Sequence, residues 1–142
     1  MELGRVKELV SSIREDWPYE GQVKGFLLKL LEGCEGSDWL KAACCLKLLI
    51  ESGIQLLYLR RFKPEERERV LRRRARRAAS FNMSMLERSG LPGPYKAKVL
   101  RAYLAIAAYV HPSPEALGQS LRPRDVERAL EAIELLFSAL AK

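Results

Sequence analysis

Apolar residues recur along most of the chain at spacings of three and four positions, and no run alternates with a period of two for long enough to form a strand. Three such stripes occupy residues 3–13, 23–31 and 39–61. We expect Gly33 to cap the C-terminus of the second helix and Ser37 to cap the N-terminus of the third. Apolar residues surround much of the third helix, so it should lie at the centre of the core.

The second half of the chain continues the helical pattern. Gly53 is expected to end or bend the third helix, and Pro64 then marks the first turn of a fourth helix. A short helix should follow and stop at Gly90. Pro94 opens another helix, and the last helix covers residues 123–141. The sequence thus predicts helices separated by short turns.

These elements predict an all-α protein of about five to six helices that ends in an amphipathic helix with heptad spacing. We expect a helical domain over residues 1–110, which carries the binding surface described below. Residues 111–122 form a Pro-rich connector, with one helical turn started at Ser113. Residues 123–142 form the C-terminal helix.

The last helix carries apolar residues spaced four, three, four and three positions apart, which is a heptad seam. Two interpretations are open for this seam. It either packs on its own domain, or it joins copies of the chain into a homo-oligomer in the manner of a leucine zipper. The residues assigned to oligomerisation in the second interpretation are Val126, Leu130, Ile133, Leu136, Phe137 and Leu140.

The charge of the chain is concentrated in one segment. The 142 residues include 25 Lys and Arg against 18 Asp and Glu, a net charge of +7. Residues 60–77, RRFKPEERERVLRRRARR, hold ten Lys and Arg against three Glu, which is also +7. The remaining charges cancel, so the basic character points to an anionic partner of this segment.

On a helical projection of this segment, the basic and apolar residues separate. Leu71, Ala75, Ala78 and Ala79 share a narrow face that is expected to lie against the core. Five guanidinium groups crowd an arc on the other side and repel one another, which an anionic partner would relieve. We name these residues the outer arginines: Arg69, Arg72, Arg73, Arg76 and Arg77.

Such an arc has three interpretations: a solvated face, a membrane contact or a nucleic-acid contact. A solvated face in a thermophilic protein usually mixes charges of both signs, and a membrane-lying helix needs larger apolar residues than alanine. Nucleic acid fits best, because arginine makes paired hydrogen bonds with phosphate. The helix has no Asn, Gln, Ser or Thr over residues 67–79, so base-specific readout of a duplex is not expected.

Aromatic residues interleave with the basic ones, which is typical of proteins that bind single-stranded nucleic acid. Phe62 and Phe81 have core packing as an equal alternative. DNA and RNA are not distinguished. The candidate contacts are Arg60, Arg61, Phe62, Lys63, Arg69, Arg72, Arg73, Arg76, Arg77, Phe81, Tyr95, Lys96, Lys98 and Arg101.

Residues for catalysis or metal binding are sparse. Cys34, Cys44 and Cys45 lie in apolar helical context, and His111 is the one histidine. The chain contains no Gly-rich phosphate loop and no G-x-S-x-G. We therefore predict no enzyme, no cofactor and no metal. The charged N-terminus and the interrupted apolar stretch at residues 46–59 favour a cytoplasmic protein without a membrane contact.

The layout of the chain resembles the ThermoDBP-like proteins of thermophilic archaea, on the segments RRFKPEERERVLRRRARRAASF and RDVERALEAIELLFSAL. This resemblance implies a basic cleft with exposed aromatic residues and an oligomer joined by the last helices. Two other classes stay open. One is a helical adaptor or small subunit of a larger ribonucleoprotein, such as a CRISPR effector. The other is a module that binds an acidic protein.

Overall fold

The computed structural model describes residues 1–13, 20–77 and 81–141, and its regular structure there is helical throughout. An all-α fold is therefore confirmed, although eight α-helices stand in place of the expected five to six, because single turns at α5 and α7 are separate elements. The helices are α1 (Gly4–Ser12), α2 (Glu20–Cys34), α3 (Trp39–Leu59), α4 (Pro64–Arg76), α5 (Ser84–Glu87), α6 (Gly93–Ala107), α7 (Pro114–Leu117) and α8 (Pro123–Ala141), with a 3₁₀ turn η1 (Ala108–Val110) after α6.

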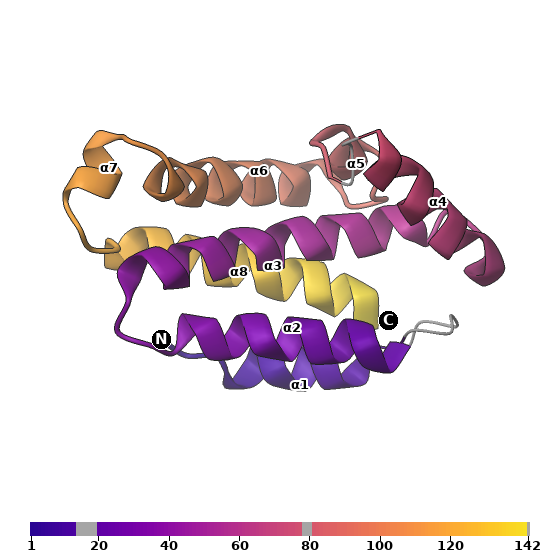
Figure 1. Ribbon diagram of the computed structural model, residues 1–142, viewed down its shortest axis with the longest axis horizontal. Coiled ribbons are helices and arrows are strands. Elements are labelled where there is room, and N and C mark those ends of the chain that lie inside the picture. Colours follow the sequence, from indigo (N-terminus) through magenta and orange to yellow (C-terminus); the bar gives the residue numbers. More distant parts are fainter. Residues whose placement is uncertain (14–19, 78–80, 142) are drawn as a thin grey trace.

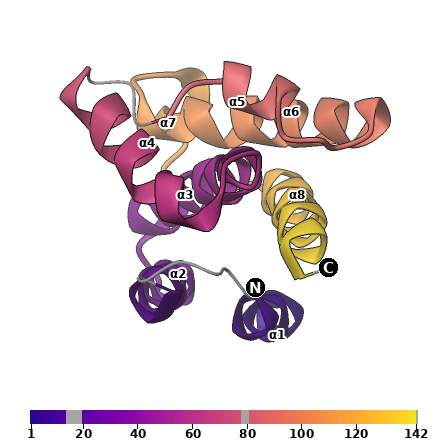
Figure 2. The ribbon, with the colours of Figure 1, turned by 90° about the vertical axis from the view of Figure 1, so that its right-hand side faces the viewer.

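Five helices, α1, α2, α3, α6 and α8, run along the long axis, and α4 projects from one end (Figure 1). Viewed along that axis, α3 lies between α2 on one side and α6 and α8 on the other (Figure 2). Leu46, Leu49, Ile50 and Ile54 of α3 are fully buried. The central position expected for this helix is thus confirmed.

The length and composition of α3 would also allow it to cross a membrane, which the shorter stretch at residues 46–59 had not indicated. However, 61% of the apolar window is buried inside the fold. A core helix of a globular protein passes the same test, so this finding is weak evidence for a membrane span.

Helix starts follow the expected signals to within a residue or two. The Asp38 carboxylate accepts from the N–H groups of Leu40 and Lys41, at 3.0 and 3.1 Å, so the cap of α3 is Asp38 and the prediction of Ser37 was wrong by one position. Pro64 lies in the first turn of α4, as predicted. Ser113 caps the predicted turn at α7 by accepting from the Ala116 N–H at 3.1 Å.

Two glycines mark close helix contacts and do not end helices. Gly33 lies inside α2, where an added Cβ would be 2.3 Å from the Cys45 Sγ. Gly53 lies inside α3, where an added Cβ would be 2.9 Å from the Leu136 Cβ. The predicted C-cap at Gly33 was therefore wrong, because this glycine lies within α2 and leaves room for the Cys45 side chain of α3.

The C-terminal helix is part of the core. α8 packs against α1, α3 and α6. Of its seam, Ile133, Leu136, Phe137 and Leu140 are buried, while the two residues nearer its start are half-buried. Within the chain, the seam thus packs on its own domain, as in the first of the two arrangements considered.

Candidate nucleic-acid interface

The outer arginines face away from the core of the molecule. All five are exposed on the solvent side of α4, as the helical projection predicted. The opposite face agrees with the prediction at Leu71, which packs on the core, and differs at Ala75, which is exposed; residues 78 and 79 lie outside the described part of the chain. The face turned toward the core consists of Arg67, Val70, Leu71 and Arg74.

Arg67 attaches α4 to the end of α3. It is buried, and its Nε donates to the carbonyl oxygens of Leu59 and Phe62, at 3.2 and 3.3 Å. Leu59 is the last residue of α3. The positive group therefore satisfies a carbonyl at the negative end of that helix.

Arg74 covers an aromatic ring at the same helix end. Its guanidinium carbon is 4.8 Å from the centre of the Tyr58 ring, and its Nη2 donates to the Tyr58 hydroxyl at 3.1 Å. The Tyr58 and Phe62 rings meet edge to face with their centres 5.5 Å apart. Arginine and two rings thus form one connected group.

These side chains line a cavity of about 280 Å³ between the end of α3 and α4, which we call the aromatic hollow. Both walls matter for its chemistry, because α3 and the turn after it supply rings while α4 supplies guanidinium groups. Phe62 was predicted as a contact, and it is half-buried here. The lining residues are Tyr58, Phe62, Val70, Arg73, Arg74 and Arg77.

The outer arginines differ in their partners. The Arg72 Nε donates to the Glu68 Oε1 at 2.9 Å, one turn earlier on α4. Four of the outer arginines make no ion pair with another described residue, and two of these line the aromatic hollow. The four are Arg69, Arg73, Arg76 and Arg77.

Arg60 is half-buried and does not line the aromatic hollow. Its guanidinium donates to the carbonyl oxygens of Ala139, at 2.8 Å, and Leu140, so it caps the C-terminal end of α8. Its predicted neighbours Arg61 and Lys63 are exposed. The two consecutive arginines at the end of α3 therefore differ: Arg60 caps α8, and Arg61 faces solvent.

The candidate residues on α6 have different surroundings. Tyr95 and Arg101 are exposed, and the Lys96 ammonium donates to the carbonyl oxygen of Glu87 at 2.9 Å. Lys98 lines a hollow with two glutamates of α8. An anionic strand that reached Lys98 would therefore also meet these two acidic residues.

Phe81 takes part in packing. Its ring lies 5.8 Å from that of Tyr103 and is half-buried. The Tyr103 hydroxyl donates to the Glu51 carboxylate at 2.8 Å, and Lys47 donates to the same carboxylate at 2.8 Å. Burial, followed by this hydrogen bond with Glu51, raises the pKa of Tyr103.

The three thiols differ in their burial. Burial is the largest cause that raises the pKa of Cys34 to about 12, so this thiol is protonated at neutral pH. Cys44 and Cys45 are half-buried, and all three thiols are free. Among the described residues, no group of three or more His, Cys, Asp or Glu is arranged to hold a metal.

Three residues of the aromatic hollow, Tyr58, Val70 and Arg74, were missing from the candidate contacts. Arg74 lies outside the arc of the outer arginines on the helical projection. Tyr58 is 16 positions away in sequence, and no local pattern connects the two. Comparisons with protein-family models, with curated proteins and with solved structures found no match. The resemblance to ThermoDBP-like proteins stays a prediction.

Proposed function

We propose that this chain binds single-stranded nucleic acid without catalysing a reaction on it. The observation that carries this proposal is the aromatic hollow, where the half-buried Phe62 ring packs on the buried Tyr58 ring and lies beside three arginines. Rings that stack on bases and cations that contact phosphates are the two components of a single-strand site. Two further arginines of α4, Arg69 and Arg76, are exposed and make no ion pair with a described residue, so folding does not require their charges.

In this proposal, the strand backbone follows the exposed side of α4. Arg69, Arg73, Arg76 and Arg77 contact phosphates, and a base enters the aromatic hollow next to Phe62. Binding is largely independent of sequence, because α4 has none of the side-chain amides or hydroxyls that read base edges. DNA and RNA are equally compatible with these contacts.

The test removes the arginines of the hollow and compares a matched control. Arg73→Ala with Arg77→Ala should weaken binding of a labelled single strand by about tenfold or more, because phosphate contacts dominate affinity. Arg124→Ala with Arg128→Ala removes the same charge from exposed positions near the start of α8, at the other end of the bundle (Figure 1). Equal losses of affinity in both variants would show that only the overall charge matters, which would contradict the proposal.

The ring contribution is tested separately. Phe62→Leu keeps an apolar side chain for packing and removes the stacking surface. A base that stacks on an aromatic ring contributes about 1–3 kcal/mol, so affinity should fall by roughly five- to a hundredfold. Unchanged affinity would show that no base stacks on Phe62 in the aromatic hollow.

A second candidate function is that of a subunit in a larger assembly. An apolar cavity of about 230 Å³ opens between α2, α3 and α4, and Phe26 on its rim is 52% exposed although it belongs to the second apolar stripe. An exposed ring beside an apolar hollow favours a protein partner. The two candidates differ in whether the isolated chain binds free strands.

A further inference from the structure

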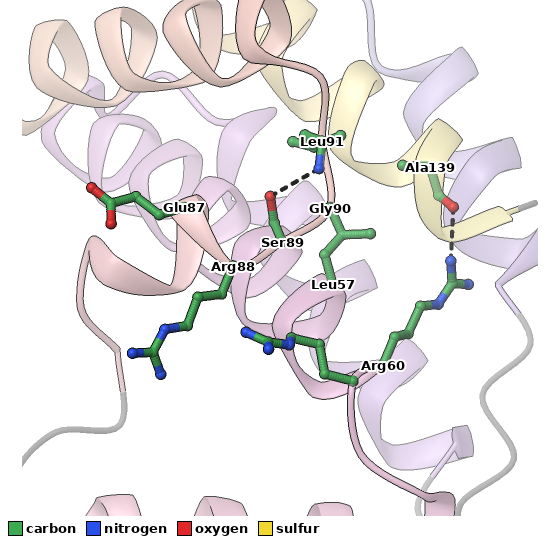
Figure 3. A pocket seen from close by; sticks show the side chains of 9 residues that line it. Leu57, Arg60, Glu87, Arg88, Ser89, Gly90, Leu91 and Ala139 are labelled. Carbon is green, nitrogen blue, oxygen red and sulfur yellow. Dashed lines mark hydrogen bonds between the residues drawn. The ribbon is translucent and has the colours of Figure 1, made fainter.

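A second basic cavity lies beside the aromatic hollow. It measures about 650 Å³ and is formed where the ends of α3, α5 and α8 meet (Figure 3). Its lining includes Arg60, Arg61 and Arg88 against a single acidic residue, Glu87. We call it the junction hollow. Arg88 was not among the candidates from the sequence, because it lies apart from the basic segment.

Two of the three arginines of the junction hollow make no ion pair with a described residue. The third, Arg60, is turned toward the Ala139 carbonyl oxygen and caps α8 (Figure 3). Arg61 and Arg88 are exposed and make no ion pair with a described residue. The Glu87 and Arg88 side chains point in different directions (Figure 3), so the acid does not pair with its neighbour.

The backbone around these two arginines is fixed. The Arg61 N–H donates to the Tyr58 carbonyl oxygen at 3.2 Å. After Arg88, the Ser89 hydroxyl donates to the Leu86 carbonyl oxygen at 2.7 Å and accepts from the Leu91 N–H at 3.3 Å. Gly90 follows with a φ of 83°, which glycine adopts without strain. The backbone positions from which both arginine side chains extend are therefore held in place, which lowers the entropic cost of binding an anion.

The two hollows are neighbours along one short stretch of chain. Tyr58 and Phe62 line the aromatic hollow, while Leu57, Arg60 and Arg61 line the junction hollow. They therefore lie on two sides of the end of α3. A strand with a base in the aromatic hollow passes this helix end, where the next basic cavity meets its backbone.

We propose that the junction hollow binds a phosphate group of the bound strand between Arg61 and Arg88. This inference rests on the proposed function, since the strand supplies the phosphate. Guanidinium groups match phosphate because they can donate two parallel hydrogen bonds to it. The phosphate is either an internal diester or the terminal monoester of a strand end, and both have the chemistry that two arginines recognise.

The experiment measures fluorescence anisotropy of a labelled single strand with the full chain across a salt series. Arg61→Ala with Arg88→Ala should weaken binding by about tenfold and make the slope of log K against log salt shallower by about 0.7, the contribution of one phosphate. Arg124→Ala with Arg128→Ala serves again as the control for lost charge. Circular dichroism melts of each variant check that the fold is kept.

Strands with a 5′-phosphate or a 5′-hydroxyl identify the source of the phosphate. An equal loss for both strands assigns an internal diester, and a loss confined to the 5′-phosphorylated strand assigns the terminus. If the Arg61 and Arg88 variant keeps wild-type affinity and slope while the Arg73 and Arg77 variant binds weakly, the inference is overturned and the proposed function stands. If the wild-type chain binds no strand, both are overturned.

Discussion

Arginine residues in this protein have three distinct environments, which the sequence presents as one basic run. Arg60 and Arg67 donate to carbonyl oxygens at the C-terminal ends of α8 and α3. Arg74 covers an aromatic ring, and others such as Arg73 are exposed. The helical projection correctly predicted which arginines point outward. It could not predict the inward ones, because their partners belong to other helices and the long arginine stem packs on apolar surface.

The first prediction concerns Arg60. Arg60→Ala should lower the free energy of unfolding by about 2 kcal/mol, because hydrogen bonds from a charged group to the α8 carbonyls are lost. Urea denaturation measures the change. Arg61→Ala is the matched control, since Arg61 is exposed and should leave stability within about 0.5 kcal/mol of the wild type. Identical midpoints for the two variants would show that Arg60 does not cap α8.

Cys34 gives a second prediction at the same scale. Its pKa is raised from 9.0 to about 12, mainly by burial, so near pH 9 the thiol stays protonated in the folded chain and ionises in the unfolded one. Its contribution to stability is present below pH 9 and is lost as the pH rises toward 12. Iodoacetamide near pH 9 should therefore modify Cys34 only after denaturation, as mass spectrometry of the native and guanidinium-treated chain would show. Rapid native modification at Cys34 would contradict its burial.

Among the elements, the helices approach one another most closely at glycines. Gly33 brings α2 to Cys45 of α3, and Gly53 brings α3 to Leu136 of α8. From the sequence, both glycines indicated helix ends or bends, since a helix-breaking residue is the only local signal. The neighbouring side chains that use this space are 12 or more positions away, so helix positions were predictable and their contacts were not. The heptad seam of α8 had the same ambiguity, because an internal partner and a second copy require the same spacing.

A pair of glycine substitutions tests these contacts. Gly53→Ala should lower the free energy of unfolding by about 1–2 kcal/mol, since the new Cβ would be 2.9 Å from the Leu136 Cβ and this crowding outweighs the better helix propensity. Gly25→Ala lies within α2 with nothing within 4 Å of its added Cβ, and should raise stability by about 1 kcal/mol. Thermal and urea unfolding compare the two. A gain for Gly53→Ala would mean that α3 and α8 are not in close contact.

In the whole molecule, the core and the proposed binding surface lie in different places. The apolar seam of α8 and the surface of α3 form a core along the long axis, while α4 lies at one end, together with the end of α3 (Figures 1 and 2). The aromatic hollow and the junction hollow both border that helix end. The composition of residues 60–77 predicted a basic surface, but the two cavities depend on how α4 and α5 are placed by tertiary packing, which no local pattern encodes.

The most direct test of the account is a salt series of wild-type binding to a single strand and to a duplex of equal length. For about five engaged phosphates, log K for the single strand should fall against log salt with a slope near −3.5. The single strand should also bind more tightly than the duplex at every salt concentration, because a duplex offers no unstacked base to the aromatic hollow. Equal and weak binding of both, or no binding at about 0.1 M salt, would contradict a single-strand site on α4.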